Sequence, residues 1–131
     1  MTKVKFYKND NNIVGFECSG HTGYEEYGKD VLCATISGIT QSTVLGLNKV
    51  LGIDIEFKRN EKVGLLKVEL PKGLSKEVMQ QAQVLLNTLF VIPLIALSLQ
   101  KSQYLSKSLV IIEANSVLLV FSQMPILSLY L

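Results

Sequence analysis

Four short segments of this sequence alternate apolar and polar residues, and that alternation is the period of a half-buried β-strand. The segments come in two pairs, at residues 2–8 and 13–18 and again at residues 53–58 and 63–70. Each pair precedes a stretch with helical spacing of apolar residues, at 31–51 and from Lys76 onward. This order predicts an α+β fold, a small two-layer domain whose mainly antiparallel sheet carries two helices on one face in the order β-β-α-β-β-α.

Short polar residues, glycine and proline mark the ends of these elements. Residues 9–12 read Asn-Asp-Asn-Asn and predict a turn, because short amide and carboxylate side chains tolerate left-handed backbone. Asp30 and Gly52 are suited to start and stop the first helix, and Ser75 is suited to cap the second. Pro93 is expected to kink or end the second helix, because proline lacks the backbone N–H.

Charged residues become rare after residue 90. The segment 91–131 contains only three, which are Lys101, Lys107 and Glu113. We therefore expect one folded domain at residues 1–90. We expect residues 91–131 to be a divergent apolar C-terminal segment that either packs onto the same domain or is aberrant, as a shifted reading frame would produce. Within it, residues 109–112 and 117–121 are predicted to be buried strands or aggregation-prone segments with few charges.

The uncharged stretch at residues 78–100 raises the question of a membrane anchor. It runs for 23 positions without a charge, which is about the length needed to span a bilayer. It also contains polar residues and a proline, which are Gln80, Gln81, Gln83, Asn87 and Pro93. We therefore expect a buried or misfolded tail rather than a spanning helix, and the membrane-anchored form stays an alternative.

Charge and cysteine usage restrict the partners and the compartment. The chain carries 13 Lys and Arg against 11 Asp and Glu, which is not the clustered basic balance of a protein held by nucleic-acid phosphates. No direct nucleic-acid partner is expected. Two cysteines in a chain that opens Met-Thr-Lys-Val-Lys, with no apolar leader, indicate the reducing cytoplasm.

One histidine and one cysteine form the only available pair of a nucleophile and a base. His21 lies in a glycine-bearing segment, 19–29, that has neither period and is predicted to be a loop. With Asp30 as N-cap, Cys33 lies at the third helical position, where unpaired backbone N–H groups and the helix dipole favour the reactive thiolate. His21 could take the thiol proton and then protonate the leaving amine of a substrate.

Each of these residues also has a purely structural interpretation. From spacing alone, Cys33 is more often a core residue than a nucleophile, and His21 is more often a solvated loop residue. Asp30 is better suited to cap the helix than to orient the imidazole. Ser37 follows Cys33 by one turn on the same side, and it is either a site contact or a plain helix serine. Cys18 shares a strand face with apolar residues and is expected to be buried.

No metal or cofactor is expected. One histidine and two separated cysteines do not complete a tetrahedral metal site, and the glycines of the loop do not fit the spacing of the common phosphate-binding motifs.

The run from Gly20 to Ala34, followed by Ile36 and Ser37, resembles the signature of the ribosomal-processing cysteine proteases (the Prp family) of Firmicutes and relatives. That signature is Gly-His, a short loop with Tyr-Gly, an Asp, two apolar residues, Cys-Ala, and a Ser four residues after the Cys. It is matched at Gly20, His21, Tyr27, Gly28, Asp30, Cys33, Ala34 and Ser37. The resemblance covers about the first 90 residues and does not extend into the apolar tail.

The resemblance implies a small α/β homodimer with a Cys-His dyad at Cys33 and His21. It implies a cytoplasmic cysteine endopeptidase that removes the N-terminal extension of a large-subunit ribosomal protein, after a Phe-Phe pair, during ribosome maturation. Gly20, Asp30 and Ser37 are then candidates for support of the dyad or for substrate contact. A catalytically silent binding module on the ribosome is the alternative.

Overall fold

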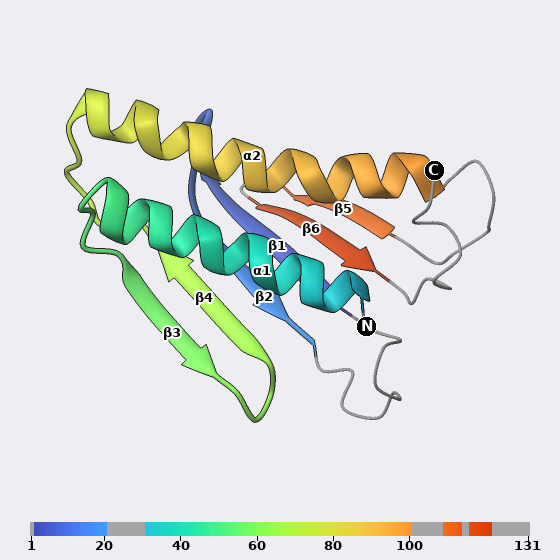
Figure 1. Ribbon diagram of the computed structural model, residues 1–131. Coiled ribbons are helices and arrows are strands. Elements are labelled where there is room, and N and C mark those ends of the chain that lie inside the picture. The colour runs from blue at the N-terminus through green and yellow to red at the C-terminus, as the bar shows by residue number, and fades with distance from the viewer. Residues whose placement is uncertain (1, 21–30, 101–108, 114–115, 122–131) are drawn as a thin grey trace.

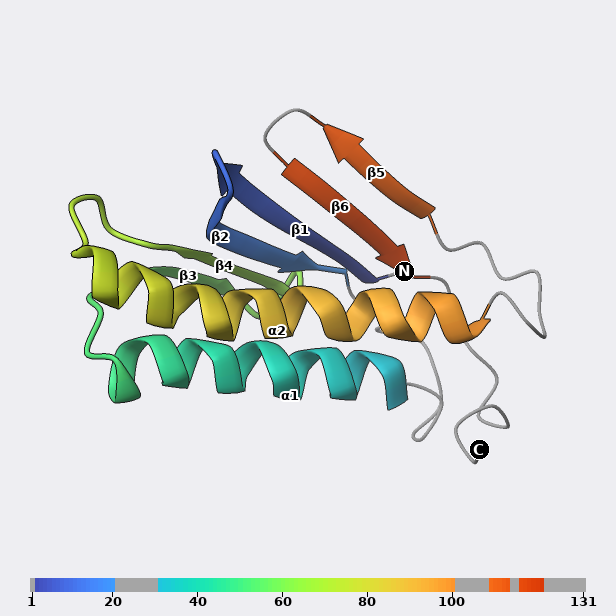
Figure 2. The same cartoon turned by 90° about the horizontal axis from the view of Figure 1, so that it is seen from above.

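The computed structural model describes residues 2–20, 31–100, 109–113 and 116–121. Two layers are present, a sheet and a pair of helices that run side by side across one of its faces (Figure 1, Figure 2). The elements in chain order are β1 (Thr2–Asn9), β2 (Asn12–Ser19), α1 (Val31–Leu45), the π-helical turn η1 (Gly46–Val50), β3 (Glu56–Asn60), β4 (Leu65–Glu69), α2 (Lys76–Gln100), β5 (Leu109–Glu113) and β6 (Ser116–Phe121).

The sheet has the strand order β3-β4-β2-β1-β6-β5, and each neighbouring pair is antiparallel. The predicted α+β class with both helices on one face is therefore confirmed. β5 and β6 come from the apolar C-terminal segment and extend the sheet beyond β1, because β6 pairs with β1 from Thr2 opposite Phe121 to Tyr7 opposite Ser116.

The core lies between the sheet and the helices. It combines the period of two along the strands with the helical spacing of α2, and its best buried members are Val4, Phe6, Ile13, Phe16, Leu47, Val68, Ala82, Leu86 and Leu89. The Phe6 ring meets the Phe90 ring edge-on at 5.1 Å between centroids, which is a favoured aromatic arrangement. Cys18 is 9% exposed within this cluster, so its predicted burial is confirmed.

The ends of several elements are also as predicted. Asp10 adopts a left-handed φ of 53° in the turn between β1 and β2. The backbone N–H of Val78 donates to Ser75 Oγ at 3.3 Å, so Ser75 caps α2. Gly52 follows the helical segment with a φ of +66°. The last turn before it is π-helical, with Leu51 N–H donating to the Gly46 carbonyl at 3.0 Å.

The prediction of a strand over residues 53–58 was wrong at its start, because β3 begins only at Glu56. The N–H of Ile53 donates to the Leu47 carbonyl at 3.0 Å, so this residue closes the end of the preceding helix instead of joining the sheet. Ile53 is 3% exposed. Its apolar character therefore reflects burial under the helix end, and alternation alone does not separate that case from a strand.

Pro93 was expected to kink or end the second helix, and the second of these alternatives was wrong. α2 runs from Lys76 to Gln100 as one helix (Figure 1). A proline removes one helical hydrogen bond and adds a clash with the preceding turn, at about 3 kcal/mol. The turns before it are anchored by Leu86 and Leu89, which are fully buried against the sheet, and this packing offsets the local cost.

One polar side chain ties α2 to the β1–β2 hairpin. Gln83 accepts a hydrogen bond from Ile13 N–H at 2.8 Å and donates one to the Ile13 carbonyl at 2.8 Å. The β1–β2 register shifts next to Ile13: Tyr7 lies opposite Gly15 and Lys8 opposite Ile13, so Val14 is the extra residue. The Gln83 amide therefore bonds both backbone groups of the residue beside the irregularity.

Candidate active site

Cys33 is the third residue of α1, because the helix begins at Val31. The side chains of residues 31–36 are outside the described part of the structure, so the backbone alone locates Cys33. At this position the first-turn N–H groups of the helix have no partner within the helix, and the positive end of the helix dipole favours a negative charge. The first turn of α1 contains no acidic residue, so no helical carboxylate competes with a thiolate there.

His21 and Asp30 lie outside the described residues. The chain is described on both sides of them. β2 ends at Ser19 and α1 begins at Val31, and these two ends lie at the same end of the molecule (Figure 1). The fold thus brings the residues that flank the 21–30 segment to one edge of the two-layer domain.

Gly20 is the last described residue before His21, and it has a φ of +125°. An L-residue with a side chain rarely adopts this conformation, whereas glycine does so without steric cost. The backbone therefore requires glycine at this position of the Gly-His pair. This is a physical reason for one residue of the signature that sequence spacing did not supply.

Ser37 is exposed one turn after Cys33. Its Oγ accepts a hydrogen bond from Gln41 Nε2 at 2.9 Å, and its carbonyl accepts one from Thr40 Oγ1 at 3.0 Å. Both contacts run along the helix.

A hollow of about 380 Å³ lies between α1 and α2, beginning next to Ser37. Its lining carries no charge and consists of Gly38, Ile39, Ser42, Thr43, Leu85, Thr88 and Leu89. Sequence periodicity did not identify this hollow, because it depends on how closely the two helices approach. Small side chains at the facing positions are the only sequence signal for it.

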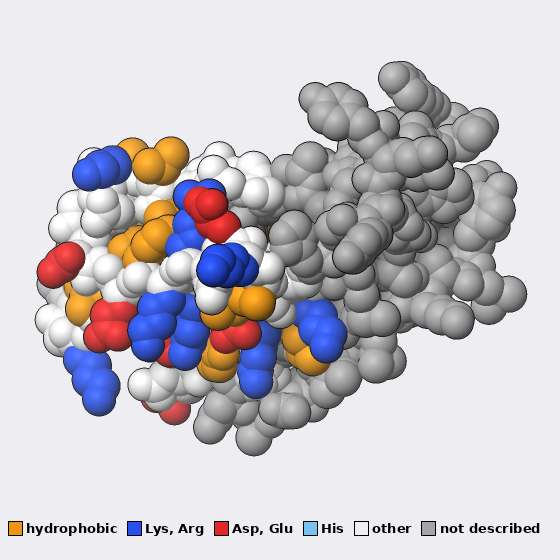
Figure 3. All heavy atoms as spheres, turned by 90° about the horizontal axis from the view of Figure 1, so that it is seen from below, with side chains coloured by type: hydrophobic (Ala, Val, Ile, Leu, Met, Phe, Trp, Pro, Cys, Tyr) orange, Lys and Arg blue, Asp and Glu red, His pale blue; other side chains and the backbone are white. Residues whose placement is uncertain are grey.

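The strands also carry a charged network around Tyr7. Its hydroxyl donates to Glu17 Oε2 at 3.0 Å, and the ammonium groups of Lys5 and Lys67 lie 5.4 and 5.2 Å from the centre of its ring. Burial, followed by the hydrogen bond to Glu17, raises the pKa of Tyr7. On the underside of the molecule, basic and acidic side chains are interspersed (Figure 3), which is the pattern of a solvated surface rather than of a cationic binding site.

A metal site and a membrane-spanning helix are two alternatives that can be compared with the described part of the chain. It contains no group of three or more His, Cys, Asp or Glu residues that could hold a metal ion. None of the helices among the described residues is both long enough and apolar enough to cross a membrane.

Similarity to known proteins extends over most of the chain. A family model described as cysteine protease Prp matches residues 1–106. The ribosomal processing cysteine protease Prp of Bacillus subtilis (strain 168) is 29% identical over 82 residues, which cover 63% of this chain and 73% of that protein. The match to the family model continues beyond the first 90 residues or so that the resemblance covered.

Solved structures share the fold. The essential ribosomal processing protease Prp from S. aureus, solved in complex with a substrate peptide, superposes with a TM-score of 0.62 at 16% identity and covers 78% of this chain and 93% of its own. SMU.848 from Streptococcus mutans superposes with a TM-score of 0.65 at 20% identity and covers 77% and 87%. The family model matches well over half of the 131 residues of this chain, and the chain therefore belongs to the Prp family of cysteine proteases.

Proposed function

We propose that this chain is an endopeptidase in which Cys33 is the nucleophile and His21 the general acid and base. The Cys33 thiolate attacks the scissile carbonyl carbon, and the oxyanion forms near the free N–H groups of the first turn of α1. His21 then donates a proton to the leaving amine as the C–N bond breaks and a thioester remains. Water activated by His21 hydrolyses the thioester and restores the thiol. The position of Cys33 as the third residue of α1 is the observation that carries this proposal.

The proposed substrate is the N-terminal extension of a large-subunit ribosomal protein, removed during ribosome maturation. Two similarities support it. The Bacillus subtilis relative is named a ribosomal processing cysteine protease, and the S. aureus protease of the same fold was solved with a substrate peptide.

Three further residues have proposed supporting roles. Gly20 provides the left-handed backbone that leads into His21, in agreement with its φ of +125°. Asp30 caps α1 rather than relaying a proton, because a carboxylate at the N-cap accepts from the helix amides. Ser37 contacts substrate through its hydroxyl, which is exposed one turn from Cys33.

We further propose a cytoplasmic homodimer in which residues 1–90 form the protease domain and residues 91–131 pack onto it. The pairing of β6 with β1 supports that packing. β1 lies between β2 and β6 in the sheet. Without β6, β1 would be an edge strand.

The test is cleavage of a synthetic peptide that carries a Phe-Phe extension, using the full chain. Cys33→Ala and His21→Ala are expected to abolish cleavage while the circular dichroism spectrum stays unchanged. The matched control is Cys18→Ala, which alters the other cysteine and is expected to keep activity, because Cys18 is buried in the core.

Retained cleavage by Cys33→Ala would overturn the assignment of the nucleophile. A wild-type chain that neither cleaves the peptide nor reacts rapidly with iodoacetamide at Cys33 would instead support the silent binding module, since a thiolate at a helix start is reactive.

A further inference from the structure

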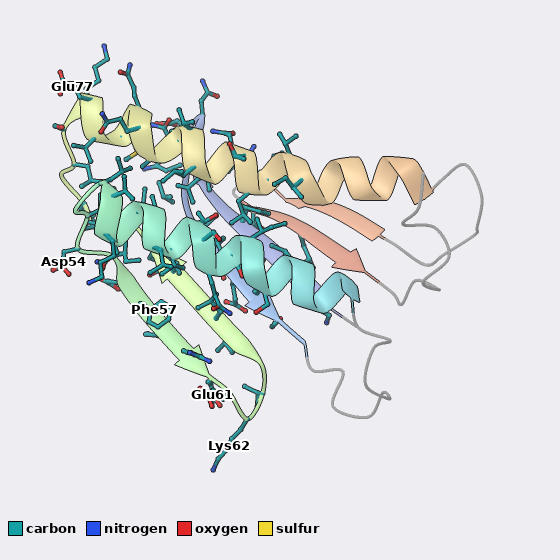
Figure 4. All side chains as sticks on the ribbon, in the orientation of Figure 1. Asp54, Phe57, Glu61, Lys62 and Glu77 are labelled. Carbon is teal, nitrogen blue, oxygen red and sulfur yellow. The ribbon has the colours of Figure 1, made fainter. Side chains whose placement is uncertain are left out.

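Phe57 is an aromatic side chain on the helix-bearing face of the sheet that the helices leave exposed. β3 pairs with β4 so that Phe57 lies opposite Val68, and directly opposite residues of an antiparallel pair share one face of the sheet. Val68 is 1% exposed, whereas Phe57 is 48% exposed. The helix layer therefore ends between β4 and β3, and Figure 4 shows Phe57 on the part of β3 that projects beyond α1.

β3 runs toward the end of the molecule where α1 begins. It is antiparallel to β4, which is antiparallel to β2, so β3 has the same direction as β2, whose end lies near the start of α1 (Figure 1). The chain just before β3 is held at the opposite end of the helical segment, because Ile53 N–H donates to the Leu47 carbonyl at 3.0 Å. The helix-bearing face of β3 thus leads from Phe57 toward the end of α1 that carries Cys33.

α1 carries a row of uncharged polar side chains that starts next to Cys33. Ser37 follows Cys33 by one turn and Gln41 follows Ser37 by another, and positions four apart lie on one side of a helix. Both residues are exposed, and Gln41 Nε2 donates to Ser37 Oγ at 2.9 Å. Ile39 and Thr43 line the hollow between the two helices, so the side of α1 that faces α2 is a different one. We call Ser37, Gln41 and Phe57 the substrate track.

The separation of Cys33 and Phe57 along this track follows from the lengths of the elements. Leu47 is about 21 Å beyond Cys33 along the helix axis, at 1.5 Å per residue. Phe57 follows Ile53, which is bonded to Leu47, and the extended residues between them lead back by at most about 13 Å. The difference leaves roughly 8–21 Å, which an extended peptide crosses in roughly three to six residues.

We propose that Phe57 is a specificity-determining residue of the peptidase, and that its ring binds an apolar side chain of the substrate peptide roughly three to six residues from the scissile bond. The inference rests on the proposed function, in which Cys33 is the nucleophile. Continuity of the track with Cys33 along α1 selects the substrate peptide as the occupant of this surface. The polar row on α1 is suited to bond a peptide backbone, and a large rigid ring favours an apolar partner.

The first experiment compares kcat/KM of the full chain for two synthetic peptides with a central Phe-Phe cleavage point. The leucine peptide carries leucine at the third to sixth residues on each side of the scissile bond, and the serine peptide carries serine there. The wild type is expected to prefer the leucine peptide about tenfold, which is the discrimination that one apolar contact provides. Phe57→Ala should abolish most of this preference, and Phe57→Leu should restore most of it.

The matched control is Val63→Ala, which removes an apolar side chain that is 56% exposed and lies outside the track. It should keep the wild-type preference. Cleavage of both peptides at equal rates by the wild type, or equal preferences for wild type and Phe57→Ala, would overturn the inference and leave the assignment of Cys33 intact.

The second experiment measures binding and does not require cleavage. In a Cys33→Ala background, a fluorescent leucine peptide is expected to bind about tenfold more tightly than the serine peptide, and adding Phe57→Ala should remove the difference. A difference that Phe57→Ala leaves unchanged would overturn the assignment of Phe57. A chain that binds the leucine peptide through Phe57 but cleaves neither peptide would refute the peptidase and keep the track as a peptide-binding surface.

Light scattering distinguishes the substrate peptide from a second copy of the chain as the occupant of the track. Phe57→Ala should have the same mass in solution as the wild type. A lower mass would overturn the proposal, because Phe57 would then be covered by another copy.

Discussion

Replacement of Gln83 by leucine tests how α2 is held on the sheet. The Gln83 amide makes two hydrogen bonds of 2.8 Å, one from Ile13 N–H and one to the Ile13 carbonyl. Ile13 is 1% exposed, so water does not replace the lost partners without a local opening. Leucine is as good a helix former as glutamine, so the perturbation is confined to these two bonds and to the weaker contact that Gln83 Nε2 donates to Met79 Sδ at 3.4 Å.

The expected loss can be estimated from the two groups that become unpaired. A buried donor left without a partner costs about 1–3 kcal/mol. The Ile13 N–H has one hydrogen and loses its partner completely, whereas the carbonyl can accept a second bond and contributes about 1 kcal/mol. Gln83→Leu should therefore lower the free energy of unfolding by roughly 2–4 kcal/mol, a large part of the roughly 5–15 kcal/mol typical of a domain.

Urea unfolding followed by circular dichroism measures this loss. An unchanged slope of the unfolding free energy against urea concentration would show that two-state unfolding is retained. Gln81→Leu is the control, because Gln81 is exposed on the same helix and should change stability by less than about 0.5 kcal/mol. Equal stabilities for Gln83→Leu and Gln81→Leu would refute the reasoning.

Two further predictions concern the sheet. A Cβ on Gly15 would lie 2.6 Å from the Val68 carbonyl oxygen. Gly15→Ala should therefore push β2 away from β4 and lower the free energy of unfolding by at least about 1–3 kcal/mol. Thermal unfolding measures this loss, and an unchanged melting temperature would contradict it. The pKa of Tyr7 is raised above its usual 10.0, first by burial and then by Glu17. The neutral phenol is thus favoured in the folded state, and its contribution is complete below pH 10 and lost as the pH rises through the higher folded value. The wild type should lose stability more steeply above about pH 10 than Tyr7→Phe, and parallel pH profiles would argue against it.

Local sequence patterns were sufficient for much of the fold. The alternation in residues 2–8 and 13–18 reflects only which face of each strand is buried, which is a property of neighbouring residues. β1 and β2 form at these positions, as predicted. The starts of α1 and α2 were predicted from candidate capping residues, since capping acts within three or four residues of the helix end, and the cap of α2 by Ser75 is present. The signature from Gly20 to Ala34 is equally local, and it indicated the family that the comparison over residues 1–106 then established.

Contacts between distant residues were not predictable in the same way. Ile53 and Ile55 alternate with polar residues as a strand does, but the first of them closes the end of a helix. The continuation of α2 through Pro93 depends on the burial of the turns before it. The pairing of Gln83 with Ile13 joins residues 70 positions apart, and no short pattern marks either one as a partner of the other.

The sequence by itself therefore determined the kind and order of the elements and the residues proposed for the chemistry, because period, capping and the Gly-His to Cys-Ala signature are properties of neighbouring residues. For the apolar C-terminal segment the sequence predicted strands or aggregation-prone segments at residues 109–112 and 117–121, and only the tertiary structure decided that they form β5 and β6 and that β6 pairs with the free edge of β1. Strand pairing is a choice among all edges that the folded chain offers. Its outcome depends on long-range packing, which the alternation along a single strand does not contain.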